Sequence, residues 1–176
     1  MEDLHQLIQE CAANNRLSQE KLYRKFYPAL FLLCKRFFAD DHEALEVLND
    51  GMLKVYKNIA NFRHDKGAFF NWVYTIVRNT ALDKLKISKQ PVAGELTESA
   101  AKVYDDNPVK ALEWKDIYKL LDTLAPATRG ICSLFYIEGF SIKDISEKLQ
   151  ISSGTVKWHL SETRKKLKPV LEKYYS

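Results

Sequence analysis

The sequence predicts an all-α protein made of two small helical domains joined by a flexible linker. Apolar residues recur at intervals of three and four along most of the 176 residues, as on the buried face of an amphipathic helix. No segment shows the alternation expected of strands. The stretch Ile87–Asn107 loses the helical pattern and is rich in small, polar and acidic residues, as linkers are. We therefore predict a first domain at residues 1–88, a linker at 89–107 and a second domain at 108–176.

Four helices are expected in the first domain. Ser18 is a fair N-cap for the second of them, and Pro28 should kink or break that helix because proline removes a backbone donor. Asp40 separates this helix from a third, and a polar loop at residues 61–67 leads into a fourth. The side chains expected to face inward on the third and fourth helices are Ala44, Val47, Leu48, Met52, Val55, Ile59, Phe69, Trp72 and Ile76.

The second domain is expected to begin with a helix whose N-cap and first residue are Asn107 and Pro108. A further helix should start at Pro126 and end at Gly139, because glycine readily adopts the left-handed conformation that terminates helices. The inward positions of these two helices are predicted to be Leu112, Ile117, Leu120, Leu121, Leu124, Ile131, Leu134 and Phe135.

The most specific pattern in the chain is a helix-turn-helix between Ser141 and Leu160. Ser141 and Asp144 can form a capping box at the start of a short helix, with Asp in place of the usual Glu or Gln. Residues 150–152 make a tight connection, and Ser153 can cap a second helix. The second helix should bury Val156, Leu160 and Leu167.

The outer face of this second helix is polar and basic, which is how a helix is offered to the major groove of duplex DNA. Cations there would neutralise phosphates while neighbouring side chains contact base edges. An ordinary helical hairpin with a solvated basic face would show the same local pattern. The outward candidates are Thr155, Lys157, Trp158, Ser161, Glu162, Arg164 and Lys165.

Composition narrows the class of protein. A net charge of +4 suits a polyanionic partner only if the cations cluster. The N-terminal residues are acidic and polar, unlike a secretory signal, and no apolar run approaches the roughly 18 residues of a membrane span. Cys11, Cys34 and Cys132 form no CxxC pair, which favours reduced, mostly buried thiols. We therefore expect a cytoplasmic protein without stable membrane insertion.

Signatures of catalysis and of metal binding are missing from the sequence. The four histidines are scattered, and no Cys lies at metal-ligand spacing from a His. There is no nucleophile elbow, phosphate-binding glycine loop or convincing pair of catalytic carboxylates. We predict a protein that is not an enzyme and needs no metal, cofactor or small-molecule substrate.

Two groups of sequence blocks, one in each predicted domain, resemble the extracytoplasmic-function (ECF) group of bacterial sigma factors, which belong to the sigma-70 family. The blocks occur in family order and spacing and cover most of the chain. Those that resemble region 2 are Asp50–Phe62 and Phe69–Leu85, and those that resemble region 4 are Leu120–Pro126, Phe135–Ile145, Gly154–Lys157 and Arg164–Leu167. The resemblance implies a factor that binds core RNA polymerase and directs promoter-specific initiation of transcription.

The resemblance implies a polymerase-binding surface on the third helix. In the family this acidic helix docks on the clamp helices of the largest subunit, and the resemblance also implies the polymerase flap as a partner. A cation-rich partner would explain exposed carboxylates by electrostatic complementarity. A solvated helix face is the alternative. The implied contacts are Glu46, Asn49, Asp50 and Lys54.

The same resemblance places the minus-10 promoter element against the polar loop and the fourth helix. Melted DNA must be held by groups that stack, donate hydrogen bonds and grip the backbone. We expect Trp72 to serve mainly in packing. The implied DNA contacts are Asn61, Arg63, Lys66, Arg78, Asn79 and Lys84.

In the second domain, the outward candidates of the helix-turn-helix match the positions that face the minus-35 element. Family members commonly carry Arg at several of these sites, whereas this chain has Trp158 and Glu162. Glu can accept from a cytosine amino group, and Trp can pack on a thymine methyl. The promoter sequence of a relative therefore does not transfer to this chain.

Two other functions fit part of the sequence. A stand-alone helix-turn-helix regulator would bind duplex operators without polymerase, as a dimer on palindromic sites; it leaves the acidic helix around Asp50 unexplained. A helical protein-interaction module would lack DNA affinity. The family also implies a possible anti-sigma partner, for which the sequence itself carries no direct sign.

Overall fold

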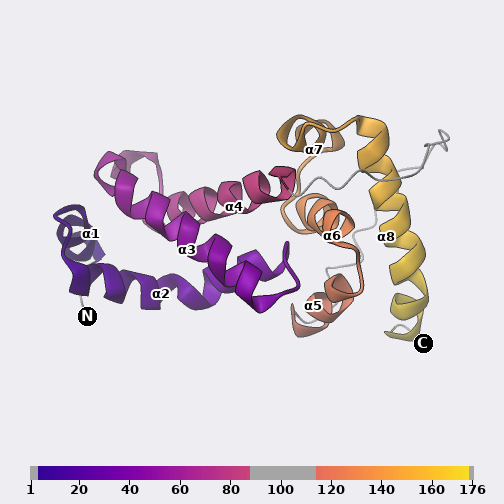
Figure 1. Cartoon of the computed structure of the whole chain (residues 1–176), viewed down its shortest axis with the longest axis horizontal. Helices are drawn as coiled ribbons and strands as arrows, with labels where there is room; N and C mark the ends of the chain where they lie inside the picture. Colours follow the sequence, from indigo (N-terminus) through magenta and orange to yellow (C-terminus); the bar gives the residue numbers. More distant parts are fainter. Residues whose placement is uncertain (1–3, 88–113, 175–176) are drawn as a thin grey trace. The chain divides into compact units, whose positions relative to one another are not determined.

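The computed structural model describes residues 4–87 and 114–174, and every regular element within these ranges is helical (Figure 1). The contacts divide the chain into two compact units, one of residues 1–35 and 40–84 and the other of residues 36–39 and 85–176. The all-α prediction is thus confirmed for the described part of the chain. The predicted linker, the helix start at Asn107 and the inward position Leu112 lie outside it.

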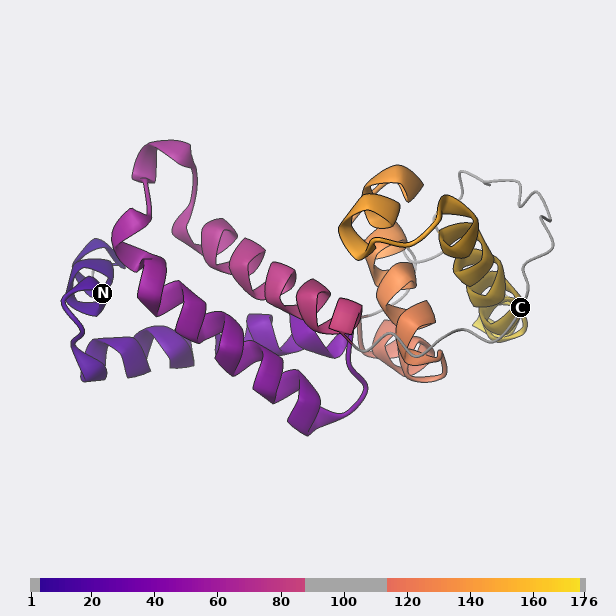
Figure 2. The ribbon, with the colours of Figure 1, turned by 45° about the horizontal axis from the view of Figure 1, so that its top comes forward.

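The first unit is an assembly of long helices that turn back on one another (Figures 1 and 2). Helix α2 packs against both α1 and α3, and α1 also contacts the short turn that follows α3. The elements are α1 (Leu4–Ala12), α2 (Arg16–Lys35), α3 (Asp41–Asn58), the 3-10 turns η1 (Ile59–Asn61) and η2 (His64–Lys66), and α4 (Phe69–Ile87).

The six inward positions predicted for α3 and for the turn after it are all buried. On α4 the prediction is partly wrong. Phe69, Val73 and Val77 form the buried face, whereas Trp72 and Ile76 are only half-buried. A helix with apolar residues at so many positions has no single face that periodicity can select, so packing against the neighbouring helices decides.

Helix α2 begins earlier than the sequence suggests. The Asn15 carboxamide oxygen accepts hydrogen bonds from the backbone N–H groups of Leu17 (3.0 Å) and Ser18 (3.2 Å), so Asn15 caps the helix. The expectation that Ser18 is the cap is wrong. Ser18 is buried within the helix, and its hydroxyl donates to the Glu10 carboxylate of α1.

Pro28 does not interrupt α2, which is continuous from Arg16 to Lys35. Of the kink or local break expected at Pro28, the break is therefore wrong, because the tertiary packing of Leu22, Phe26, Leu30 and Leu33 holds the helix together across the missing donor. The predicted start of α3 is confirmed, because the Asp40 carboxylate accepts from the backbone N–H of Glu43 at 2.9 Å.

The second unit is a set of shorter helices packed on one long one (Figure 1). Helix α8 packs against α6 and α7. The core includes Ile117, Leu120, Leu121, Leu124, Cys132 and Leu167. The elements are α5 (Trp114–Asp122), α6 (Pro126–Cys132), the π-helical turn η4 (Ser133–Ile137), α7 (Ile142–Leu149) and α8 (Ser153–Tyr174).

The π-helical turn changes which side chains face inward after α6. The Glu138 backbone N–H donates to the Ser133 carbonyl at 3.0 Å, a five-residue step that widens the helix. Leu134 is buried as predicted, but Phe135 is half-buried, so that expectation is wrong. The predicted start at Pro126 and the end at Gly139 (φ 74°) are confirmed.

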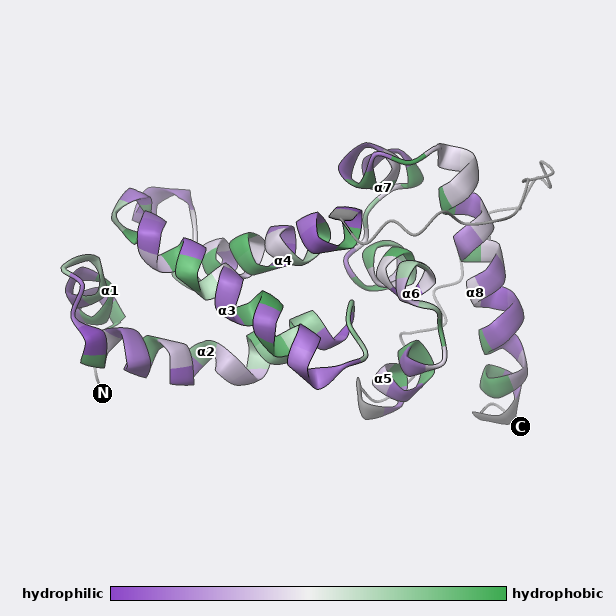
Figure 3. Cartoon of the chain, viewed as in Figure 1, coloured by the Kyte–Doolittle hydropathy of each residue, from purple (hydrophilic) through white to green (hydrophobic). Residues whose placement is uncertain are grey.

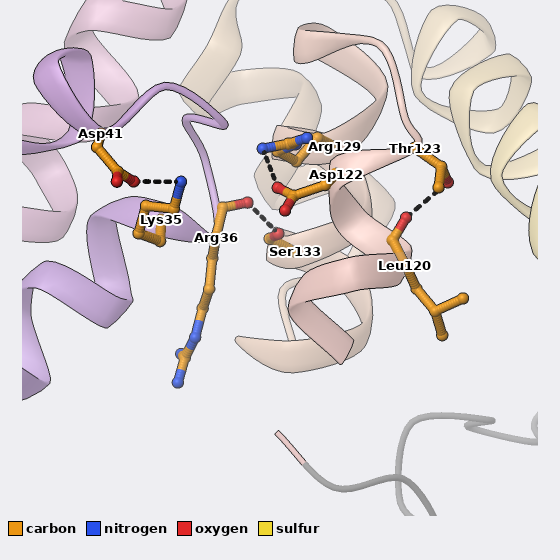
Figure 4. Close-up of polar contacts among 8 residues, drawn as sticks. All are labelled: Lys35, Arg36, Asp41, Leu120, Asp122, Thr123, Arg129 and Ser133. Atoms are coloured by element: carbon orange, nitrogen blue, oxygen red, sulfur yellow. Dashed lines mark hydrogen bonds and ion pairs between the residues drawn. The ribbon is translucent and has the colours of Figure 1, made fainter. Parts of the chain in front are cut away.

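An ion pair stabilises the region where α5 ends and α6 begins. Arg129 is 1% exposed, and its Nη1 lies 3.1 Å from the Asp122 carboxylate, as Figure 4 shows. Burial lowers the pKa of Arg129, and the charge of Asp122 opposes that shift. In the same view the Thr123 hydroxyl donates to the Leu120 carbonyl at 2.7 Å, closing the end of α5.

Neither described range contains a helix long and apolar enough to cross a bilayer.

Candidate nucleic-acid interface

The helix-turn-helix starts with a complete capping box. The Asp144 backbone N–H donates to Ser141 Oγ (3.1 Å), and the Ser141 backbone N–H donates to Asp144 Oδ2 (3.1 Å). The Ser141 hydroxyl, which donates to Asp144 Oδ2 at 2.6 Å, and then the Ser141 backbone N–H hold the pKa of Asp144 below its ordinary value. The box predicted from the sequence is confirmed, and it satisfies backbone donors at the start of α7 that would otherwise have no partner.

The turn between α7 and α8 is closed by backbone and hydroxyl contacts. Gln150 has a left-handed conformation (φ 55°), and the Ile151 N–H donates to the Ser146 carbonyl at 3.1 Å. Helix α8 is then capped by Ser152, whose Oγ accepts from the Thr155 backbone N–H at 3.0 Å. The predicted cap, Ser153, is one residue too late, because two adjacent serines offer the same oxygen and only geometry distinguishes them.

The inward side of α8 is as apolar as predicted and also contains polar groups that sequence reasoning missed. Val156, Leu160 and Leu167 are buried. His159 is 4% exposed, and its Nδ1 lies 2.9 Å from the hydroxyl of Thr128 on α6. Burial lowers the pKa of His159. His159 follows Val156 by three residues, so helical periodicity puts it next to the core. That spacing was the signal in the sequence from which its burial could have been predicted.

The outer side of α8 combines exposed cations with side chains held in place. Lys157 and Lys165 are exposed, and Figure 3 shows hydrophilic residues along much of the helix surface in view. Lys165 Nζ lies 3.0 Å from the Glu162 carboxylate. Arg164 Nε donates to the Tyr136 hydroxyl at 3.1 Å. The half-buried members of the predicted set are Thr155, Trp158, Ser161, Glu162 and Arg164.

In the first unit, the predicted loop at residues 61–67 is folded into two 3-10 turns, and the aromatic side chain of Phe62 packs it against α4. Phe62 contacts Phe69 edge-on (ring centroids 4.9 Å apart) and lies 5.6 Å from Trp72. Phe69 and Trp72 are stacked with centroids 5.7 Å apart. Trp72 therefore packs, as expected, but at the edge of the core. The predicted loop contacts that remain exposed are Asn61, Arg63 and Lys66.

The predicted contacts on α4 are not equivalent. Asn79 is exposed and Arg78 is half-buried. Lys84 forms an ion pair of 2.7 Å with Glu46 of α3. The structure thus brings together one residue from the predicted minus-10 set and one from the predicted polymerase-binding set, which the sequence did not suggest.

The exposed face of α3 carries the four predicted polymerase contacts, Glu46, Asn49, Asp50 and Lys54. Asn49 is positioned by the Tyr23 hydroxyl, which donates to its Oδ1 at 2.7 Å. Leu53 lies on the same face and is 52% exposed. Sequence reasoning missed Leu53, although its position off the buried stripe and four residues after Asn49 was a usable signal.

Neither a metal site built from three or more side chains nor thiol chemistry has support in the described ranges. Within them no three His, Cys, Asp or Glu side chains are arranged to hold a metal ion. All three cysteines are buried and free, as predicted. Burial raises the pKa of the Cys11 thiol to about 11 and those of Cys34 and Cys132 to about 12, so none is a reactive thiolate at neutral pH.

Comparison with known protein families assigns both units. Residues 22–89 match the model of sigma-70 region 2, and residues 114–167 match that of sigma-70 region 4. Several relatives that align with most of the chain are named ECF RNA polymerase sigma factors. The chain belongs to the ECF group of the sigma-70 family.

Similar sigma factors are found in several bacteria. The sigma-H factor of Pseudomonas aeruginosa is 26% identical over 95% of this chain and 93% of its own length. SigW of Bacillus subtilis is 29% identical over 81% of this chain and 82% of its own. SigM of Mycobacterium tuberculosis is 26% identical over 94% and 83%, respectively.

The two matched regions cover all the predicted contacts of this sigma factor. Region 2 spans the loop at residues 61–67 and most of α2, α3 and α4, and region 4 spans α5 to the middle of α8. A stand-alone helix-turn-helix regulator would not account for the region 2 match. That alternative, and the interaction module, are therefore set aside.

Proposed function

We propose that this sigma factor binds core RNA polymerase through the exposed face of α3 and applies two separate DNA-binding surfaces to one promoter. The observation that carries the proposal is that face itself. Two carboxylates, Glu46 and Asp50, share it with the fixed amide of Asn49 and with exposed Leu53. A cationic partner surface with an apolar centre would complement it.

The clamp helices of the largest polymerase subunit are the proposed partner of this face, with Lys54 at its margin. Glu46 already has a cation, Lys84, at 2.7 Å. Asp50 is therefore the more suitable residue for an ion pair with polymerase, and Leu53 for the apolar contact. Exposed ion pairs are individually weak, so the contact depends on these groups acting together.

The minus-10 element is proposed to bind at the loop and along α4. Asn61, Arg63 and Lys66 are exposed on a loop that Phe62 fastens to the core. Such a loop offers amide and cationic groups from a fixed base, which suits capture of unstacked bases and their backbone. Arg78, Asn79 and Lys84 would continue the backbone contacts along α4.

The minus-35 element is proposed to bind at the outer face of α8. Lys157 and Lys165 are exposed and suited to phosphates. Arg164 is held by Tyr136 and Glu162 by Lys165, so both side chains are oriented before DNA arrives. Trp158, together with Thr155 and Ser161, completes the surface that would read base edges.

The two proposed DNA surfaces lie in separate domains, so tethering matters. A linker at residues 89–107 would make the second contact intramolecular and raise its effective concentration, provided that the promoter spacing suits the tether. The chain itself would catalyse nothing, because the polymerase supplies the chemistry. Its site of action would be the cytoplasm, where it would also be available to an anti-sigma protein.

Core binding by a charge-reversal pair tests the proposal. Asp50→Arg should weaken the affinity for purified bacterial core polymerase by about tenfold or more, because repulsion replaces attraction. Glu20→Arg, a reversal of an exposed glutamate on α2, is the matched control and should bind normally. If Asp50→Arg bound core polymerase with the affinity of the wild type, and its far-ultraviolet circular dichroism were unchanged, the proposal that α3 is part of the interface would be contradicted.

A further inference from the structure

Two histidines that are far apart in the sequence of the first unit meet where α1 contacts the loop at residues 61–67. His5 belongs to α1 and His64 to η2, 59 positions apart. Nδ1 of His5 lies 3.2 Å from Nε2 of His64, and the ring centroids are 5.0 Å apart. Both side chains are exposed, so small ions from the solvent can reach them.

This separation suits two ligands of one metal ion. Imidazole nitrogens bind Zn²⁺ at about 2.0–2.1 Å, so two of them on a tetrahedral ion lie about 3.3 Å apart. In the metal-free pair, one ring donates its N–H to the lone pair of the other. An ion would replace that shared proton, and small rotations of two exposed rings would direct both lone pairs at it.

Neighbouring side chains contact both histidine rings of such a site. The Gln9 amide nitrogen, Nε2, lies 2.9 Å from His5 Nε2, the ring nitrogen that does not contact His64. A half-turn of this amide about its Cγ–Cδ bond presents its oxygen as an acceptor. His5 would then keep its proton on Nε2 and its lone pair on Nδ1, which is the usual arrangement of a metal-binding histidine. The His64 ring is held edge-on against Phe62, with centroids 4.7 Å apart.

We propose that His5 and His64 form a site for a divalent first-row transition cation such as Zn²⁺ or Ni²⁺, which fastens α1 to the loop. Imidazole favours these ions over Mg²⁺ and Ca²⁺. Two protein ligands leave the remaining positions to water, so the ion would exchange with solvent. The site goes beyond the proposed function, because its formation requires neither polymerase nor DNA.

Calorimetric titration of the full chain with NiCl₂, in a buffer that does not bind metals, tests the site. The wild type should bind one ion, and His5→Gln and His64→Gln should each lower the affinity by about tenfold or more, since each removes a ligand. His42→Gln, a change at an exposed histidine on α3, is the matched control and should bind like the wild type. Binding that survives either substitution, or no binding by the wild type, would overturn the proposal.

Limited trypsin digestion tests whether the ion joins the two segments. Trypsin cuts after Arg63 and Lys66, which flank His64 in the exposed loop. NiCl₂ should slow these cuts severalfold in the wild type and in His42→Gln, but not in His5→Gln, whose loop keeps its own histidine. Cuts at Lys165 and Lys166 serve as the internal control for the activity of the protease. Equal slowing in His5→Gln would show binding without the link to α1 and would contradict the proposal.

Discussion

His159 is a titratable side chain inside the region 4 domain, on the inward side of the helix proposed to read DNA. Its ring is buried and lies 2.9 Å from the Thr128 hydroxyl. Burial lowers its pKa below the ordinary value of 6.5, and the charge of Glu162 only partly opposes that shift. The folded domain therefore favours the neutral ring.

This shift predicts a loss of stability in mild acid. As the pH falls through 6.5, the unfolded chain binds a proton that the folded chain still refuses, so the free energy of unfolding decreases until the folded pKa is passed. The decrease is at most about 1.4 kcal/mol per pH unit for one group. Urea unfolding at pH 7.5 and 5.5, followed by Trp158 fluorescence with Trp72 and Trp114 changed to Phe, measures it. Between pH 7.5 and pH 5.5, His159→Gln should lose less stability than the parent. An equal loss in both proteins would show that His159 is not the group responsible.

Arg129 is a second residue whose environment makes a definite prediction. Its guanidinium is almost wholly buried, whereas its partner Asp122 is half exposed (Figure 4). Asp122→Asn would leave a buried charge without its counter-ion, and about 2 kcal/mol of stability should be lost, less than for a pair buried on both sides. The same urea experiment at pH 7.5 measures it.

The control for that variant is Glu172→Gln. Glu172 lies 3.8 Å from Lys168, and both side chains are well exposed. Loss of such a surface pair should change stability by less than about 0.5 kcal/mol. If the two variants were equally stable, the Arg129 ion pair would have no special role in this domain.

At the scale of elements, the close crossing of α3 and α4 depends on Gly51. A Cβ at this position would lie 2.9 Å from Val77 Cγ2 and 3.0 Å from the Val77 Cα. The obstacle is backbone as well as side chain, so a rotamer change does not remove it. The spacing of the two helices is set here, and α3 carries on its exposed face the residues proposed to bind polymerase.

Gly51→Ala should therefore destabilise the region 2 domain in spite of alanine's higher helix propensity. Overpacking costs about 1–3 kcal/mol, whereas the propensity gain is about 1 kcal/mol, so a net loss of about 1 kcal/mol is expected. Thermal or urea unfolding measures it. Gly154→Ala on α8 is the control, because its Cβ would meet only Ser152 Oγ at 3.5 Å and should be neutral or stabilising. A stabilised Gly51→Ala would show that α4 can move aside.

The helices and most of their buried faces could be predicted from the sequence, because apolar periodicity and burial have the same cause. The inward stripe of α3 and that of α8 are examples. The predictions that failed concern features that depend on contacts between residues far apart in the sequence, or on which of several equivalent polar groups caps a helix. Asn15 rather than Ser18, and Ser152 rather than Ser153, supply the caps.

The candidate sites show the same division. Region 2 and region 4 motifs indicated which surfaces to consider, since those residues are adjacent in the chain. The pairing of Lys84 with Glu46, and the support that Tyr23 gives Asn49, join separate helices and have no signature in sequence. The π-helical turn that leaves Phe135 half-buried depends on the whole packing of α6, and periodicity alone predicts an ordinary helix there.

At the scale of the whole molecule, two helical domains are proposed to act on promoter DNA through RNA polymerase. Each offers a proposed contact surface, with acids on α3 in the first domain and cations on α8 in the second. Selectivity would then arise from simultaneous engagement of both promoter elements by a chain held on polymerase. The separate domains are expected to bind promoter DNA weakly.

Promoter-selective transcription tests this account most directly. Core polymerase would be mixed with the full chain and with genomic DNA fragments from the same organism, and the 5′ ends of the transcripts would be mapped. We predict a small set of defined start sites that share two upstream elements at constant spacing and that disappear when the chain is omitted. Start sites identical with and without the chain would contradict the central claim that it directs initiation.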